Sequence, residues 1–226
     1  MNIKENVDKI LNQIEATKVK TGISTNVKLV AATKTQTASK IIEAHLAGVQ
    51  EIGENRVQEA AEKLKALGLP KLKRRFIGHL QTNKVNRCID FFDTIDSIDS
   101  LRLAKKINKR AALIGKRVPS LLEINTTQEP QKKGFTPEEV DEMLATLGME
   151  NLNVCGLMTL GPKTREEKPT RRAFRALRRL KEDLNHQHRE KEITELSMGM
   201  SKDYVIGVEE GSTMVRIGTG IFGKRQ

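Results

Sequence analysis

A single lysine, Lys34, stands near the end of VAATKT (30–35), a run of small and apolar residues. Such a run is typical of a chain entering a buried strand. Burial and nearby cations lower the pKa of a lysine amine, and the neutral amine attacks aldehydes. The small residues before Lys34 leave room for a flat ligand. Taken alone, the stretch is explained more simply by a solvated lysine just past a strand, so the second interpretation, a nucleophile in a pocket, needs support from elsewhere.

Two pairs of a glycine and a hydroxyl residue predict a phosphate site. MGMSKD (198–203) contains Gly199 and Ser201, and IGTG (217–220) contains Gly218 and Thr219. Glycine lets the backbone approach a ligand closely, so that its N–H groups can donate. Either pair alone is typical of an ordinary turn. An aldehyde that also carries a phosphate is pyridoxal 5′-phosphate (PLP), which binds lysine as a Schiff base, and the two pairs together with Lys34 predict this cofactor.

The elements that must position these residues alternate regularly along the chain. After an amphipathic helix expected at 3–19, strands are predicted at 28–33, 51–55, 75–79, 91–98, 119–125, 153–160, 193–199 and 213–219. Helices are predicted between them at 38–48, 56–67, 83–88, 100–112, 136–149, 165–187 and 201–209. Ser100 and Thr136 are start signals, and Gly48, Gly68 and Gly115 are stop signals. The alternation indicates parallel βαβ units.

Two α/β architectures fit this alternation, a closed barrel and a doubly wound open sheet. Eight strands and the chain length favour the barrel, and the first strand lacks the glycine-rich fingerprint of dinucleotide-binding open sheets. We therefore predict one domain over residues 1–226, a TIM-type (β/α)8 barrel with an extra N-terminal helix. In such a barrel the functional residues lie at the C-terminal ends of the strands. Polar groups follow there on nearly every strand, among them Lys34, Asn55, His79, Asn125 and Arg216.

The composition includes a formal net charge of +11, which raises the question of nucleic-acid binding. The basic stretches at 71–75, 102–110 and 171–181 come with no zinc-finger spacing, stacking aromatics or helix-turn-helix signature. Solvated basic helix faces explain them more simply. Cys88 and Cys155 lie far apart, as expected of thiols in a reducing compartment. There is no signal-peptide core or membrane-length apolar run, so we expect a soluble, cytoplasmic protein.

Several motifs occur in an order that resembles the pyridoxal-phosphate homeostasis protein family: VAATKT, GENRVQE, FIGHLQTNK, KKG (132–134), GLMTL, LSMGMSKD and GSTMVRIGTGIFGKR. That family is a single barrel similar to the N-terminal domain of bacterial alanine racemases. The resemblance implies that Lys34 carries PLP as a Schiff base. It also implies roles for Asn55 beside the ring, Arg216 at the ring nitrogen, Met200 in the pocket wall, and Ser201, Gly218 and Thr219 at the phosphate. Lys132 matches a family lysine thought to influence cofactor transfer, whereas Arg75 and Gly220 depart from the family pattern.

The arginine bears on whether the protein is an enzyme. A guanidinium accepts no proton, so Arg216 disfavours protonation of a ring nitrogen that faces it and weakens the ring as an electron sink. Racemases resembling this barrel take a second base, a tyrosine, from another domain, and the only tyrosine here is Tyr204. We therefore expect no catalytic residue and no metal ligand, but a monomeric carrier that buffers PLP and supplies it to apo-enzymes, without binding nucleic acid or membrane.

Two alternatives remain open at this point. One is a PLP-dependent amino-acid racemase or lyase of low activity, and the other, based on charge alone, is a nucleic-acid-associated protein.

Overall fold

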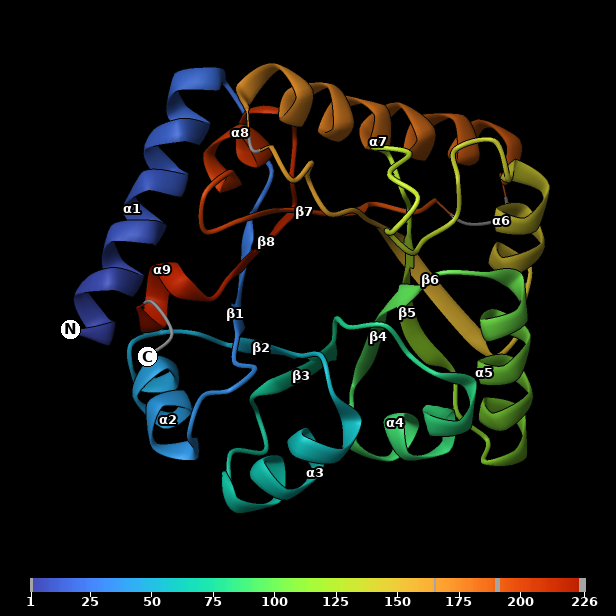
Figure 1. Ribbon diagram of the computed structural model, residues 1–226, viewed down its shortest axis with the longest axis horizontal. Helices are drawn as coiled ribbons and strands as arrows, with labels where there is room; N and C mark the ends of the chain where they lie inside the picture. The colour runs from blue at the N-terminus through green and yellow to red at the C-terminus, as the bar shows by residue number, and fades with distance from the viewer. Residues whose placement is uncertain (1, 165, 190–191, 224–226) are drawn as a thin grey trace.

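Eight parallel strands close into a barrel in the order of the sequence, β1 to β8, with β8 pairing back onto β1. The structure is a computed structural model that describes residues 2–164, 166–189 and 192–223. The predicted TIM-type barrel is therefore confirmed (Figure 1). The strands are β1 Lys28–Ala32, β2 Glu51–Glu54, β3 Lys73–Phe76, β4 Thr94–Ile98, β5 Val118–Glu123, β6 Leu152–Met158, β7 Glu195–Met200 and β8 Met214–Ile217.

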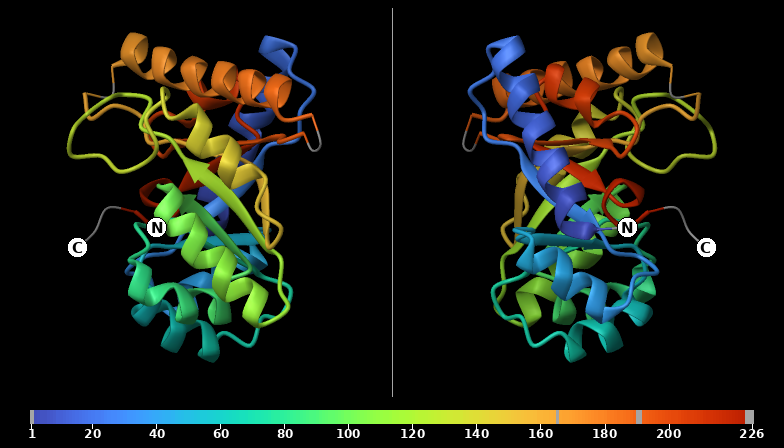
Figure 2. Two further views of the ribbon diagram at one scale, coloured as in Figure 1. Left: turned by 90° about the vertical axis from the view of Figure 1, so that its right-hand side faces the viewer. Right: turned by 90° about the vertical axis from the view of Figure 1, so that its left-hand side faces the viewer.

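Helices form the outer layer of the barrel (Figures 1 and 2). They are α1 Ile3–Thr21, α2 Ala38–Leu46, α3 Val57–Ala66, the 3₁₀ helix η1 Thr82–Lys84, α4 Val85–Phe91, α5 Leu101–Leu113, α6 Val140–Leu147, α7 Glu167–Gln187, α8 Tyr204–Glu209 and α9 Thr219–Phe222. Ser100 accepts a hydrogen bond from the amide of Leu103 and so caps α5, as predicted. None of the described helices is both long enough and apolar enough to cross a membrane.

The extra N-terminal helix α1 completes this outer layer. Its buried residues Ile3, Val7, Ile10 and Ile14 follow helical spacing and form one apolar face. That face packs on α8, α9 and α2, where α8 and α9 have only 6 and 4 residues. The Asn6 amide also donates to the Ile221 carbonyl of α9 at 2.9 Å. Helix α1 therefore covers the part of the barrel that these short helices leave open.

Some predicted boundaries are wrong. Strand β3 ends at Phe76 instead of 79, and the strand predicted at 91–98 begins only at Thr94, because 91 still belongs to α4. The helix predicted from 136 begins at Val140, because residues 136–139 form a turn in which the Thr136 amide donates to the Glu139 carboxylate. The helix predicted from 201 begins at Tyr204, and β8 ends at Ile217.

The basic face of α7 is less solvated than predicted. Arg171 donates to the carboxylates of both Glu209 and Glu210, and Arg175 donates to that of Glu210. The Glu210 side chain is almost fully buried, so these ion pairs tie α7 to the end of α8. Part of the positive charge of the 171–181 stretch is therefore used within the fold.

A buried group of charges lies inside the barrel. Arg75 on β3 pairs with Glu51 on β2 and with Asp96 on β4, where both Asp96 oxygens lie within 3.1 Å of its Nη1. Glu195 on β7 lies 3.9 Å from its Nη2. Although burial opposes the charged form, these carboxylates raise the pKa of Arg75 above its usual value. The family departure noted at Arg75 is therefore compensated by acids from its two neighbouring strands, β2 and β4, and from β7.

We predict that Arg75→Met lowers the free energy of unfolding by about 3–5 kcal/mol, because removing one member of a buried ion pair leaves the other without compensation. Urea unfolding followed by circular dichroism measures this. Arg74→Met is the matched control, since Arg74 pairs with Asp93 at the surface with both side chains over one-third exposed. Its expected cost is below about 1 kcal/mol. Equal losses in the two variants would contradict the proposed importance of the buried group.

Candidate functional site

Strand register brings Lys34 to the C-terminal rim of the barrel. Ala32 at the end of β1 aligns with Gly53 of β2, and the Thr33 amide donates to the Gly53 carbonyl at 2.9 Å. The Thr33 hydroxyl donates to the Glu54 carboxylate at 2.6 Å, and the Lys63 ammonium of α3 donates to the Thr33 carbonyl at 2.9 Å. These bonds fix the chain immediately before Lys34, whose side chain is half-buried.

The residue after Lys34 has an unusual backbone conformation. Thr35 has a φ of 68°, in the left-handed region that a β-branched residue rarely adopts. Backbone strain of this kind concentrates at functional sites. The turn after β1 is therefore a second, independent sign that the position of Lys34 is functionally constrained, and the sequence carried no signal for it.

Asn55 lies on the same rim, directly after β2. A side chain on Gly78 would come within about 2.5 Å of Asn55, so the glycine at the end of the β3 segment lets the two rim segments pack closely. A pocket of about 310 Å³ opens beside Asn55, and His79 and Lys84 line its other side. Asn55 and Lys34 thus follow adjacent strands at the same level of the barrel.

The two predicted phosphate segments lie side by side. The Ser201 hydroxyl accepts hydrogen bonds from the Gly218 amide at 3.3 Å and from the Gly220 amide at 3.1 Å. Gly218 backs onto Ala32, whose carbonyl oxygen would lie 3.4 Å from an added side chain. Thr219 is exposed at the first position of α9. Two backbone donors therefore converge on one hydroxyl oxygen at the rim, beside the strand that leads to Lys34.

The turn that carries Ser201 is held by Asp203. Its carboxylate accepts from the Met200 amide at 2.5 Å, and its own amide donates to the Met200 carbonyl at 3.0 Å. Met200 is paired in register with Arg216 of β8 and keeps an exposed side chain. The turn therefore holds Ser201 and Met200 at the end of β7.

Arg216 lies deeper in the barrel and is almost fully buried. Its Nη1 donates to the Ser197 carbonyl at 2.8 Å and to the Ser197 hydroxyl at 2.5 Å, while Nη2 donates to the Thr159 carbonyl at 2.8 Å. Burial lowers the pKa of Arg216, and the charges of Asp96, Glu123 and Asp203 oppose this. The guanidinium is thus fixed by Thr159 just after β6 and by Ser197 within β7.

Glu123, at the end of β5, is a buried carboxylate that the sequence prediction missed. Burial and, less strongly, the charge of Asp99 raise its pKa, the charges of Arg216 and His79 lower it, and the net result is a pKa of about 7 instead of 4.5. His79 itself is half-exposed and lies 2.8 Å from the Asp99 carboxylate. An acidic residue inside the apolar run LLEI (121–124) was the available signal.

Lys132 lies in the segment between β5 and α6 and holds it against the segment after β6. Its ammonium donates to the Thr127 hydroxyl at 2.9 Å and to the Gly161 carbonyl at 2.8 Å, and it pairs with Glu129 at 2.6 Å.

No cluster of three or more His, Cys, Asp or Glu side chains suited to a metal ion occurs within the part of the chain that the structure describes.

Comparison with known proteins identifies the family. The model of the family described as alanine racemase, N-terminal domain, matches residues 2–226. The pyridoxal phosphate homeostasis protein of Aquifex aeolicus is 39% identical over 228 residues, which is 100% of both chains. Its counterpart in Synechocystis is 38% identical over 88% of this chain and 92% of its own. The chain belongs to the pyridoxal phosphate homeostasis protein family. The resemblance seen in the sequence motifs is thereby confirmed.

Solved structures agree with this family. The PipY protein of Synechococcus elongatus, solved with PLP bound, is 33% identical and covers 98% of this chain and 100% of its own with a TM-score of 0.88. An alanine racemase of Clostridium difficile is 19% identical, with a TM-score of 0.78 over 98% of this chain and 57% of its own. The second likeness shows that this homeostasis-family chain shares the barrel fold of the racemase.

We predict that Glu123 makes stability depend on pH. An acid whose pKa rises on folding, here from 4.5 to about 7, binds more protons in the native state, so stability falls as pH rises through that window. At 1.36 kcal/mol per pKa unit, the loss is at most about 3 kcal/mol. Glu123→Gln removes this loss. Between pH 5 and pH 8 the free energy of unfolding should therefore fall less in this variant than in the wild type.

Urea unfolding at the two pH values measures the effect. Glu62→Gln, an exposed carboxylate on α3, is the matched control and should follow the wild type at both values. If Glu123→Gln keeps the same pH dependence as the wild type, the buried carboxylate is not the titrating group.

Proposed function

We propose that this protein binds PLP covalently through Lys34 and serves as an intracellular store that buffers the cofactor and supplies it to other proteins. The observation that carries the proposal is the register of β8, β1 and β2, which brings Gly218, Lys34 and Asn55 to adjacent positions on one rim. Family membership supports the same cofactor, because relatives are named for its homeostasis and PipY was solved with PLP bound.

The residues present fit the cofactor. Two amides converge on the Ser201 hydroxyl. In the proposed complex the phosphate accepts hydrogen bonds from the Gly218 amide and from the hydroxyls of Ser201 and Thr219. Hydrogen bonds to such a charged acceptor are worth about 1.5–3 kcal/mol each. Bound PLP would supply an electrophilic aldehyde, and Lys34 is the rim amine that we propose would hold it.

Asn55, Met200 and Arg216 complete the proposed pocket. Asn55 flanks the ring and Met200 lines the wall at the end of β7. Arg216 faces the ring nitrogen, and its hydrogen bonds to Ser197 and Thr159 hold the guanidinium in one orientation. Because a guanidinium has only donors, the ring nitrogen stays unprotonated beside it. That arrangement suits storage of the cofactor better than withdrawal of electrons from a bound amino acid.

The environment of Tyr204 also supports a carrier. Tyr204 begins α8 and packs against Gly199 so closely that a Cβ atom added to this glycine would lie 2.8 Å from the Tyr204 Cα atom. Burial raises the pKa of Tyr204 above its usual value, so its hydroxyl is harder to deprotonate than that of an ordinary tyrosine. The proposal therefore includes the absence of efficient catalysis.

A single domain over residues 1–226, a monomeric state and a cytoplasmic location belong to the same proposal and rest on the sequence.

We predict that Lys34 is the residue that holds the cofactor. Borohydride reduction of protein loaded with PLP, followed by peptide mapping, should place the label on Lys34, and Lys34→Arg should abolish it. Lys84→Arg, on the same rim, is the matched control and should retain the label. Label found mainly on Lys84 or Lys132 would overturn the assignment.

We predict that the loaded protein transfers PLP but does not turn over amino acids at an enzymatic rate. Incubation with L-amino acids in deuterium oxide should give α-proton exchange far below about 1 per second, a low rate for an enzyme. The same preparation should restore activity to an apo PLP-dependent enzyme. Exchange at or above that rate, with D-isomers formed, would favour the alternative of a racemase or lyase.

A further inference from the structure

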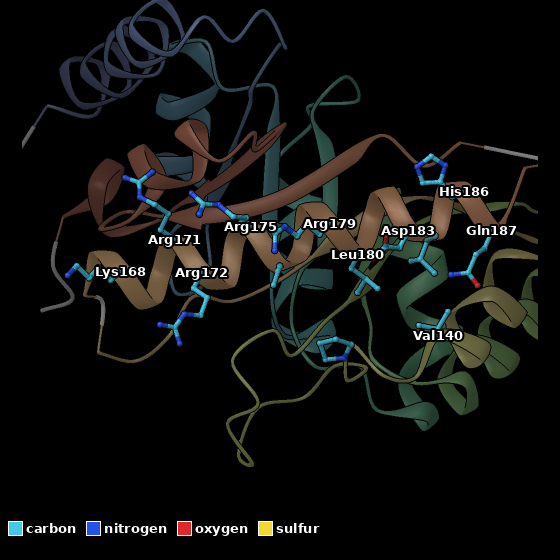
Figure 3. Close-up of a pocket in the computed structure, with 13 residues that line it drawn as sticks. Val140, Lys168, Arg171, Arg172, Arg175, Arg179, Leu180, Asp183, His186 and Gln187 are labelled. Atoms are coloured by element: carbon cyan, nitrogen blue, oxygen red, sulfur yellow. The ribbon is translucent and has the colours of Figure 1, made fainter.

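A groove of about 860 Å³ runs along α7, outside the barrel and next to α6 (Figure 3). Its apolar wall consists of the half-buried Pro137 just before α6, Val140 at the start of α6 and Ala176 on α7, with the buried Leu180 and Leu184 of α7 beneath them. Helix α7 has 21 residues and is therefore about 30 Å long at 1.5 Å per residue. The groove thus has the length and the apolar surface to hold an extended or helical segment.

Positive charge surrounds this apolar wall. The lining includes Lys168, Arg171, Arg172, Arg175 and Arg179, against a single acid, Asp183. Arg171 and Arg175 already form ion pairs with Glu209 and Glu210 at the end of α8. In Figure 3, Arg171 and Arg175 point to one side of α7 and Arg172 points to the other.

Three of these cations remain available to a ligand. Lys168, Arg172 and Arg179 are exposed, and they form no ion pair with any residue in the described ranges 2–164, 166–189 and 192–223. They recur along α7 at helical spacing, so they form a stripe on one side of the helix. An exposed stripe of cations of this kind attracts an anionic partner.

We propose that this groove, the α6–α7 groove, binds an acidic amphipathic segment of a partner protein. The apolar wall would take the apolar face of the segment, and the cationic stripe would take its carboxylates, as in other helix-in-groove interfaces. A nucleic acid fits less well, because the lining has no Phe, Tyr or Trp on which bases could stack, and an apolar wall gives nothing to a phosphate backbone. The inference does not rest on the proposed cofactor function.

The test uses a fluorescein-labelled peptide of about 18 residues, which spans about 27 Å as a helix. The peptide carries Glu on one face and Leu on the other, and a scrambled peptide of equal composition lacks the two faces. Fluorescence anisotropy should show saturable binding of the amphipathic peptide and at least about tenfold weaker binding of the scrambled one, a difference of about 1.4 kcal/mol. Arg172→Glu/Arg179→Glu should weaken amphipathic binding by about tenfold or more, because like charges then oppose the peptide.

The matched control is Arg102→Glu/Lys106→Glu on α5. Both of its residues are exposed on a basic helix, so the change in net charge is the same. Neither residue lines the groove, and salt screens exposed charges, so binding should change by less than about twofold. Equal weakening by the two double variants would reduce the effect to general charge attraction and overturn the proposal. So would a single-stranded oligouridylate of matched charge that binds more tightly than the peptide and is equally sensitive to Arg172→Glu/Arg179→Glu.

Discussion

Two arginine side chains, Arg75 and Arg216, are buried inside the barrel, and the surrounding strands must compensate both of them. Taking a guanidinium out of water costs several kcal/mol unless hydrogen bonds and opposite charges offset it. Arg75 is compensated by carboxylates on β2, β4 and β7. Arg216 is hydrogen-bonded mainly to the carbonyl groups of Thr159, just after β6, and Ser197, within β7. Each arginine thereby fixes strands other than its own, and the shape of the barrel depends on both.

The different compensation of the two arginines separates the barrel into two parts. The carboxylates around Arg75 form ion pairs with it. At Arg216 the nearest partners are uncharged, and the carboxylates of Asp96, Glu123 and Asp203 act on it only through space. A cation without a bonded carboxylate distinguishes the part of the barrel near the C-terminal ends of the strands, where the proposed cofactor site lies.

Much of the fold and of the candidate site could be predicted from local patterns. The alternation of apolar runs with helical patterns predicted the eight strands, and the position of Lys34 after a run of small residues predicted its place on the rim. The turn at 136–139 could not be predicted, because Thr136-Pro137-Glu138-Glu139 is also a good helix start and only the Glu139 side chain bonded to the Thr136 amide favours the turn. Strand β3 lies at 73–76 instead of 75–79 because its pairing runs from Lys73 opposite Glu51 to Phe76 opposite Glu54 of β2, and such pairing between strands is not visible in a local pattern.

The site residues that escaped prediction depend on contacts between distant strands. Glu123 becomes a perturbed acid only through burial near Asp99, Arg216 and His79, which the sequence does not place together. The ion pairs of Arg171 and Arg175 similarly require α8 to end beside α7. Period-two and helical patterns show which face of an element is apolar, but they do not show which charged residue on another element will lie opposite it.

The pairing of β8 with β1 also determines when the protein can fold during synthesis. Lys28 aligns with Met214, so β1 lacks its second neighbour until Met214 has left the ribosome. At about 5–20 residues per second, that delay lasts roughly 10 to 40 seconds. During this time β1 presents an unpaired edge of the kind that promotes association between chains. Release of the C-terminal segment, with α9 docking on α1, is therefore the step that ends the exposure of the nascent chain to aggregation.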